Sequence, residues 1–519
     1  MNLSEKIGQR LMVGIKGSAL DTETRELLEE IQPGSVILFK RNIVSALQVK
    51  ELILEIKELL FIPPLIAIDQ EGGLVVRFIR DATVFPGNMA LGATDSYDLA
   101  FKQGIVSSSE LKNMGIDMNL APVVDVITTY DNPGITIRSF GENPFHVAKL
   151  GNAYIEGTQA MKVAAVAKHF PGKGAAQADA HKDLPVVSLS RDDFEEVHLL
   201  PFQKAIETGV QGVMSTHIYC PSLEGNQRRP ATFSCRIVKY YLREKLKFKG
   251  VILSDDMEMG AIARYYPIGE ACIKASLSGH DFLLICSDYE KQRIAQKHLF
   301  NAYNNGELSI DDLGASIERI RSLRDFCEST PEEIDPQIVS IEARDLAQHI
   351  ADRSITVATD KRGLLPLRDR HDKRIVLILP DLSHFDAIEQ GYDSSCKHFF
   401  LKEMKAYFSG DIRTSFIPIQ IPLKGISNTL NSISRNDTVI ACIFDAKANA
   451  GQRQLIKRLH RLEAKVIMVL VRNPFDIAFL TPNDTCIITY GFRKNQLCSL
   501  LKVMFGKIEA KGSLPFEKR

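Results

Sequence analysis

The sequence predicts an α/β protein in which a (β/α)8 TIM-like barrel is followed by a smaller α/β sandwich-type domain. Short apolar runs alternate with longer helical patterns over the first two thirds of the 519-residue chain. Most of these runs are apolar at nearly every position, as strands buried on both faces are. Eight strand–helix units of this kind are typical of a barrel. A doubly wound open sheet gives the same periodicity and is the alternative architecture.

The elements follow from this pattern in chain order. The predicted barrel strands are 12–15, 35–39, 65–69, 117–121, 164–169, 212–216, 250–255 and 281–286. Helical patterns lie between them, among them 98–114, 147–161, 191–208 and 236–246. Each connection is long enough to return the chain to the start of the next parallel strand.

The barrel pattern stops near residues 328–333, and a second α/β domain begins after a helix-like segment at 338–351. Its predicted strands are 355–358, 374–379, 438–443, 466–471 and 486–490, with a helix at 453–462. We therefore divide the chain into a catalytic barrel (1–335), a linker helix (336–354) and a C-terminal α/β domain (355–519).

Composition excludes several partner classes. Lys plus Arg equals Asp plus Glu, at 64 each, so net charge offers no general attraction to nucleic acid or to an anionic membrane. No apolar run reaches the roughly 18 residues of a membrane span, and the chain does not start like a signal peptide. Nine dispersed cysteines without a CxxC pair are typical of reduced core residues. We expect a cytoplasmic protein, and its oligomeric state is not predicted.

Four polar residues stand at the C-terminal ends of different predicted strands: Asp69, His169, His217 and Asp255. Each alone is an ordinary residue for a strand end. In a barrel, however, these ends converge on one face, where active sites are built. The four together therefore predict an active site.

A loop rich in glycine follows the fifth predicted strand and contains Asp179 and His181. A carboxylate two residues away can hold the imidazole in one tautomer and favour its protonated form. Such a histidine can give a proton to a leaving oxygen and later take one from water. A solvent-exposed pair without a role is the alternative, as is a metal site that also includes His169.

Asp255 directly follows the apolar run 250–254, so its carboxylate emerges at the mouth of the predicted barrel. There it can attack an anomeric carbon and form a covalent glycosyl-enzyme, with retention of configuration. Asp256 is the rival for this role, because both faces of the strand are apolar. Helix capping is the structural alternative for either aspartate.

Further charged residues supply donors and acceptors for sugar hydroxyls. Lys168 and His169 end the fifth strand, Arg77 follows the motif Asp69–Gly73, and Arg138 stands in the segment 137–141. Charged groups that are buried and satisfied by several hydrogen bonds suit a small polar ligand such as a hexose. Each arginine alone is equally consistent with an ordinary ion pair.

These motifs resemble glycoside hydrolase family 3, in its β-N-acetylglucosaminidase branch. The resemblance covers most of residues 5–325, and its specificity comes from the order and spacing of several motifs together. They are Asp69–Gly73, Arg138–Gly141, the loop 168–181, Met214–His217, Pro230–Ser234 and Phe248–Ile262. The segments 355–357, 364–367 and 473–476 resemble the C-terminal domain of the family less closely.

The resemblance implies specific roles. Asp255 is the nucleophile, His181 is the acid/base and Asp179 is the partner of that histidine. Asp69, Arg77, Arg138, Lys168, His169 and His217 match positions that line the sugar pocket. The branch removes non-reducing terminal β-linked N-acetylglucosamine, often from muropeptides in bacterial cell-wall recycling, and needs no metal or other cofactor. The second domain is assigned no catalytic residue.

The chain departs from the family pattern within the loop that carries the histidine. Lys173 stands where the family usually has His, Ala175-Ala176 replaces Asp-Thr, and Ala180 replaces Ser. These changes affect the charge and conformation beside the leaving group. The altered loop leaves open a sugar-binding protein with weak turnover. A phosphorylase that uses the same intermediate is a further alternative, because a histidine acid/base leaves less negative charge to repel phosphate.

Overall fold

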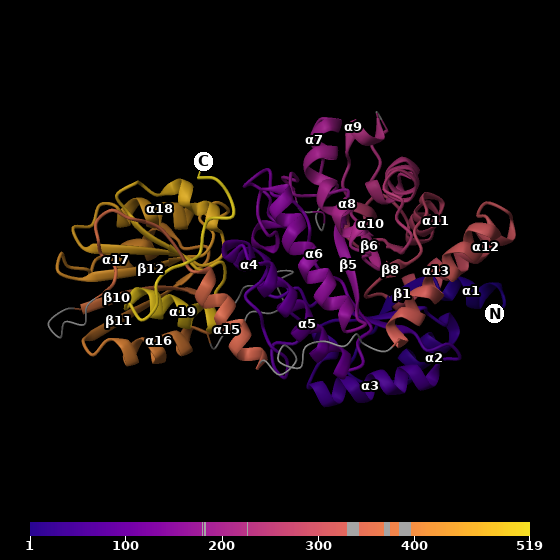
Figure 1. Ribbon diagram of the computed structural model, residues 1–519, viewed down its shortest axis with the longest axis horizontal. Coiled ribbons are helices and arrows are strands. Elements are labelled where there is room, and N and C mark those ends of the chain that lie inside the picture. Colours follow the sequence, from indigo (N-terminus) through magenta and orange to yellow (C-terminus); the bar gives the residue numbers. More distant parts are fainter. Residues whose placement is uncertain are drawn as a thin grey trace.

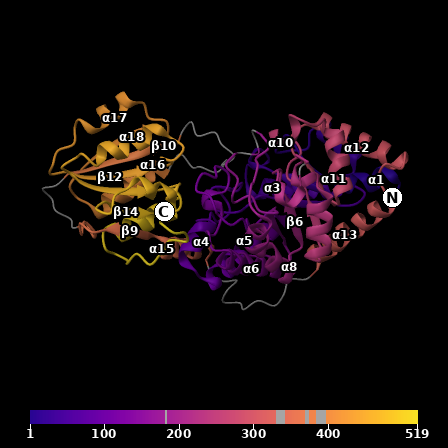
Figure 2. The same cartoon turned by 90° about the horizontal axis from the view of Figure 1, so that it is seen from above.

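The computed structural model describes residues 1–178, 180, 183–225, 227–329, 342–367, 374–382 and 396–518. A barrel and a smaller sheet domain lie side by side, with helix α15 (Ala343–Ser354) between them (Figure 1). Turned by 90°, the view again separates the two domains, with α4 (Asn88–Thr94) on the side of the barrel nearest the second domain (Figure 2).

The barrel sheet confirms the predicted fold. Its strands are hydrogen-bonded in the order β7-β6-β5-β4-β3-β2-β1-β8, and every pairing is parallel. A parallel bridge between Leu253 of β7 and Phe282, the residue before β8, closes the ring, which excludes an open sheet. The strands are β1 (Leu11–Gly14), β2 (Ser35–Leu38), β3 (Leu65–Ile68), β4 (Met118–Asn119), β5 (Ala164–Phe170), β6 (Gly212–Ser215), β7 (Val251–Leu253) and β8 (Leu283–Ile285).

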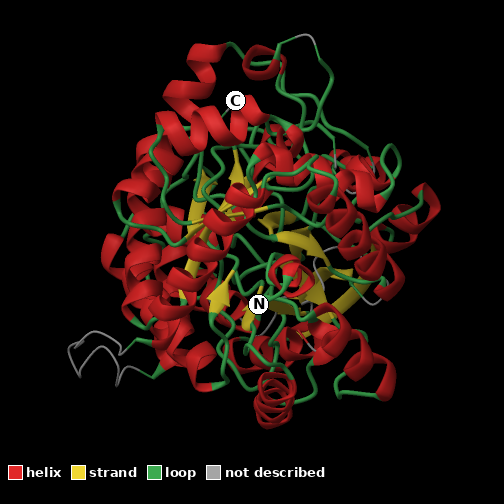
Figure 3. Ribbon diagram, turned by 90° about the vertical axis from the view of Figure 1, so that its right-hand side faces the viewer, coloured by secondary structure: helices red, strands yellow, loops and turns green. Residues whose placement is uncertain are grey.

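Helices surround these strands (Figure 3). The longer ones are α2 (Thr22–Ile31), α3 (Ala46–Leu59), α5 (Tyr97–Asn113), α6 (Pro144–Ala160), α8 (Leu200–Glu207), α11 (Ile268–Ser278), α12 (Tyr289–Asn304) and α13 (Ile310–Glu328). Shorter ones are α1 (Leu3–Gly8), η1 (Lys40–Asn42), η2 (Thr136–Arg138), α7 (Arg191–Asp193), η3 (Phe194–His198), α9 (Pro221–Glu224), η4 (Ala231–Phe233) and α10 (Gly260–Ala263). Ile320 and Leu323 of α13 pack with the apolar side chains inside the barrel, such as Met12 and Val166.

Two predicted helices differ from the observed ones. The segment 191–208 is divided into α7, η3 and α8, and Pro201 stands in the first turn of α8, where a missing N–H costs nothing. The segment 236–246 forms η5 (Arg236–Lys245), which is wound as a π-helix. Periodicity over so few residues does not distinguish these windings. No helix among the described residues has the length and apolarity needed to cross a membrane.

The second domain has one six-stranded sheet in the order β11-β10-β12-β13-β14-β9, in which only β9 is antiparallel. Helices α16 and α19 cover one face, and α17 and α18 cover the other. The elements are β9 (Thr356–Asp360), β10 (Arg374–Asp381), α16 (Cys396–Tyr407), β11 (Asp411–Pro418), α17 (Leu423–Leu430), β12 (Thr438–Ile443), α18 (Ala450–Leu459), β13 (Lys465–Leu470), η6 (Pro474–Phe479), β14 (Thr485–Ile488) and α19 (Lys494–Met504).

One strand of this domain was absent from the sequence prediction. Strand β11 is a partly exposed edge strand with several polar residues, so it lacks the apolar run that marks a buried strand. The linker helix begins at Ala343 among the described residues, and 338–341 lie outside them. The division at 335 and 354 stays a prediction.

Candidate active site

The C-terminal ends of the barrel strands bring most of the predicted residues to one face. Asp69 follows β3, Lys168 and His169 end β5, His217 follows β6, and Asp255 follows β7. Arg77 and Arg138 reach the same face from the loop after β3 and from η2. Asp179 and His181, the predicted proton-transfer pair, lie outside the described residues.

Charged side chains of opposite sign form a buried network on this face. The Lys168 ammonium group contacts Asp69 Oδ1 and Glu71 Oε1, each at 2.7 Å. Arg138 donates two hydrogen bonds to the Glu71 carboxylate, at 2.9 and 2.7 Å. Arg77 donates to Asp69 Oδ2 at 3.2 Å. With two carboxylates and three cations, each charged group of the network has at least one partner of opposite charge.

The pKa values follow from this arrangement. Burial favours the neutral form of Glu71, but Arg138 and Lys168 outweigh it and lower the pKa. Burial likewise opposes the charge of Lys168, whereas the carboxylates of Asp69 and Glu71 raise its pKa. The network is therefore fully ionised at neutral pH.

The pKa of Asp69 makes the stability of the folded protein depend on pH in the acidic range. Burial favours its protonated form, yet Lys168 and Arg77 lower the pKa from 3.8 to about 2. Because folding lowers this pKa, Asp69 contributes about 2 kcal/mol to the free energy of unfolding. This contribution is fully present above about pH 4 and is lost as the pH falls toward 2. Urea unfolding between about pH 6 and 2.5 should show a steeper acid loss for the wild type than for Asp69→Asn. Equal slopes would contradict this prediction.

His169 is held by a carboxylate that the sequence analysis did not identify. Its Nδ1 lies 2.8 Å from Asp125 Oδ2, and both side chains are buried. Asp125 Oδ1 also accepts the backbone N–H of Lys173 at 2.7 Å. Burial raises the pKa of Asp125 to about 6, against the opposing effect of Lys173. Asp125 thereby orients the His169 ring and fixes the start of the loop that contains Asp179 and His181.

His217 is fixed on both ring nitrogens. Nδ1 lies 2.7 Å from the Thr232 hydroxyl, and Nε2 lies 3.0 Å from the backbone carbonyl of Asp256. The carbonyl accepts from Nε2–H, which sets the orientation of the ring. His217 therefore connects the end of β6 to the segment that carries Asp255.

The two aspartates after β7 have different surroundings. Asp255 is partly buried, and its Oδ1 accepts the N–H of Asp256 at 2.9 Å. Asp256 Oδ1 accepts the N–H of Glu258 at 3.1 Å, a local turn contact. Burial raises the pKa of Asp256 to about 7, although the Glu258 N–H lowers it. The raised pKa favours the protonated form of Asp256, and a protonated carboxyl group is a poor nucleophile.

The pKa values of two neighbouring side chains, Cys286 and Lys173, both depend on Asp255. Burial raises the pKa of the Cys286 thiol, and the carboxylates of Asp69, Asp255 and Asp256 raise it further. Burial lowers the pKa of Lys173, and Asp255 opposes that shift. Asp255 stands after β7 and Asp69 after β3, at the same ends of parallel strands, so the two carboxylates share one mouth of the barrel.

Glu71 and Asp125 are the site residues that sequence reasoning missed. Glu71 belongs to the motif Asp69–Gly73, so its position was visible while its role was not. Asp125 stands in an irregular segment beyond β4, without a strand pattern to place it. Among the described residues, no three His, Cys, Asp or Glu side chains are grouped so as to hold a metal ion.

Comparison with known proteins identifies the family of the chain. Residues 2–323 match the model of the glycosyl hydrolase family 3 N terminal domain. Beta-hexosaminidase A of Pseudoalteromonas piscicida is 28% identical over 99% of this chain and 97% of its own. A beta-hexosaminidase of Nitrosomonas eutropha is 38% identical over 54% of this chain and 80% of its own.

Among solved structures, a glycoside hydrolase family 3 beta-N-acetylglucosaminidase from Paenibacillus sp. str. FPU-7 superposes with a TM-score of 0.91. It is 30% identical and is aligned over 100% of this chain and 99% of its own. The beta-glucoside phosphorylase BglX has a TM-score of 0.82 at 23% identity, over 100% of this chain and 94% of its own, a likeness of fold alone. The chain belongs to glycosyl hydrolase family 3 and is a glycoside hydrolase.

Proposed function

We propose that the protein is a retaining exo-β-N-acetylglucosaminidase. The observation that carries the proposal is the position of Asp255 at the same barrel mouth as the charged network of Asp69, Glu71, Lys168 and Arg138. A pocket of paired charges suits the hydroxyl groups of one terminal sugar, and a carboxylate beside it suits attack on the anomeric carbon. The names of the aligned relatives supply the N-acetylhexosamine class.

The proposed mechanism has two steps. An Asp255 carboxylate oxygen bonds to the anomeric carbon while the glycosidic bond breaks, and His181 gives its proton to the leaving oxygen. The neutral His181 then takes a proton from water, the water oxygen bonds to the anomeric carbon, and the Asp255 ester bond breaks. Asp179 holds His181 in position and favours its protonated form in the first step.

The biological setting is also a proposal. A muropeptide with a terminal N-acetylglucosamine is a substrate of the right class, and cell-wall recycling in the cytoplasm is the corresponding process. All nine cysteines are free, and most are buried, which is consistent with a reducing compartment.

A substrate comparison tests the proposal. Purified protein should hydrolyse a chromogenic β-N-acetylglucosaminide with a kcat/KM at least about 10-fold above that for the matching β-glucoside, because one well-placed contact contributes about 1.4 kcal/mol to discrimination. Faster turnover of the glucoside would refute the substrate class. Free N-acetylglucosamine as the product in phosphate buffer supports hydrolysis, and sugar 1-phosphate would identify a phosphorylase.

A further inference from the structure

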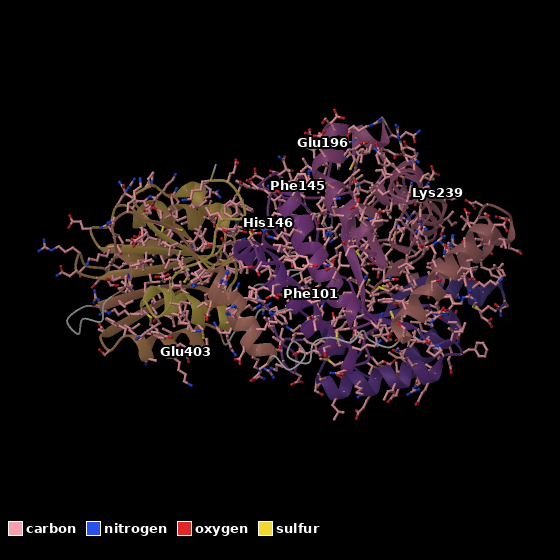
Figure 4. All side chains as sticks on the ribbon, viewed as in Figure 1. Phe101, Phe145, His146, Glu196, Lys239 and Glu403 are labelled. Atoms are coloured by element: carbon pink, nitrogen blue, oxygen red, sulfur yellow. The ribbon has the colours of Figure 1, made fainter. Side chains whose placement is uncertain are left out.

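The second domain contacts the barrel at the loop that carries the sugar-pocket charges. The loop after β3 places Asp69, Glu71 and Arg77 within nine residues of each other. The side of the barrel that carries Phe145 and His146, at the start of α6, faces the second domain, whereas Lys239 lies on the far side (Figure 4). The contact therefore joins the two domains beside the candidate active site.

Arg493, the residue before α19, makes the central contact. Its side chain is only 6% exposed, and its Nε and Nη2 atoms donate to the carbonyl oxygen of Gly73 at 2.9 and 2.6 Å. The backbone N–H of Arg493 donates to Gln496 Oε1 at 3.1 Å. The Gln496 side chain also donates to the Thr489 carbonyl at 3.0 Å. The backbone of Arg493 is thus anchored to its own domain while the guanidinium group binds the loop.

Gly73 occupies the tip of a tight turn between Glu71 and Arg77. The N–H groups of Glu71 and Gly72 donate to the Val75 carbonyl at 3.0 and 3.2 Å. Gly73 has a φ of +56°, and a Cβ atom there would stand 2.8 Å from the Pro86 carbonyl oxygen. The turn therefore has little freedom to shift without moving the carboxylate of Glu71.

The same end of α19 holds the returning segment of this loop. Asn495 donates to the Val84 carbonyl at 3.1 Å, and Gln496 donates to the Pro86 carbonyl at 3.4 Å. The Gly73 N–H in turn donates to the Phe85 carbonyl at 2.8 Å. Both sides of the loop are therefore fixed to each other and to the second domain.

Apolar packing extends the contact to the other sugar-pocket arginine. One buried cluster includes Leu74 and Val75 from the β3 loop together with Phe475 and Tyr490 of the second domain. It also contains Ile135 and Ile137, next to Arg138, and Tyr130 stacks on Phe475 with ring centroids 4.2 Å apart. Arg138 binds Glu71, so the second domain supports both partners of this ion pair.

We infer that the second domain is a positioning element for the sugar pocket and that Arg493 is the residue through which it holds the Asp69–Arg77 loop. Arg493 acts through Gly73 and does not touch the sugar. The inference rests on the proposed function for its substrate. It also explains why a domain without a catalytic residue lies beside the active site.

Kinetics of Arg493→Ala test the inference. Loss of two hydrogen bonds to one carbonyl allows the loop to shift, and about 10-fold corresponds to about 1.4 kcal/mol of lost binding. We expect KM for the N-acetylglucosaminide and the Kd of free N-acetylglucosamine both to rise about 10-fold, with kcat changed less than about 3-fold, because the network binds ground and transition states alike. Arg493→Lys keeps a cationic donor and should recover part of both losses.

Lys502→Ala is the matched control, because Lys502 lies on the same helix and pairs with Asp352 of α15 at 2.8 Å rather than with the loop. It should leave KM and Kd within about 2-fold of the wild type. Unchanged KM and Kd in Arg493→Ala would overturn the inference, as would equal losses in the control. If Arg493→Ala does not fold, Arg493→Lys with wild-type KM and Kd would overturn it. A wild type that binds the sugar without turnover would defeat the proposed function, while the Kd comparison still decides this inference.

Discussion

Asp255→Ala is expected to lower kcat for β-N-acetylglucosaminide hydrolysis at least about 1,000-fold, which corresponds to about 4 kcal/mol of transition-state stabilisation. The physical reason is the loss of the carboxylate that forms the covalent intermediate. Steady-state kinetics measure the loss, and added azide provides a second readout. Azide fits the space left by the side chain and attacks the opposite face of the sugar, so the product from a β-substrate should be the α-glycosyl azide.

Asp256→Asn is the matched control, because it changes the neighbouring aspartate while preserving its local contact. The amide oxygen can still accept the Glu258 N–H, and Asp256 itself is about half neutral at pH 7. The variant should keep kcat within about 5-fold of the wild type, as expected of a site outside the covalent step. The opposite result, an inactive Asp256→Asn beside an active Asp255→Ala, would transfer the nucleophile role to Asp256.

The fold was predictable because buried parallel strands are apolar on both faces. This property alone identified the runs at 65–69 and 212–216, and each contains a barrel strand in the structure. Strand β11 was missed because it lies at the edge of its sheet with several polar side chains exposed. A run of apolar residues therefore identifies a buried strand. An edge strand is only half buried and does not show this run.

The convergence of the strand-end residues on one face was predictable, but their pairings were not. Strand ends indicated Asp69, His169, His217 and Asp255, because the barrel brings those ends together. Glu71 and Asp125 depend instead on loops that cross the barrel mouth, and their partners are distant in sequence. The periodicity of a sequence does not show which loops contact each other. The ion-pair network could therefore be identified only in the structure. The roles of Asp179 and His181 stay predictions.

Lys168→Met is expected to be the most destabilising substitution in the pocket. It removes the cation between two carboxylates and leaves Asp69 and Glu71 buried with less compensating charge. Removal of one partner from a buried ion pair costs about 3 to 5 kcal/mol. Urea unfolding near pH 7 should show a loss of about this size, partly offset by Arg77 and Arg138.

The pH dependence separates lost charge pairing from lost packing. Without Lys168 the pKa values of the two carboxyl groups rise in the folded protein, so the variant regains stability as the pH falls and these groups become neutral. The difference from the wild type should therefore shrink between about pH 7 and 5. Lys16→Met is the control, because Lys16 and Glu23 form an exposed pair whose attraction is screened by water. A loss in Lys168→Met that does not change with pH would attribute the effect to packing and refute the electrostatic account.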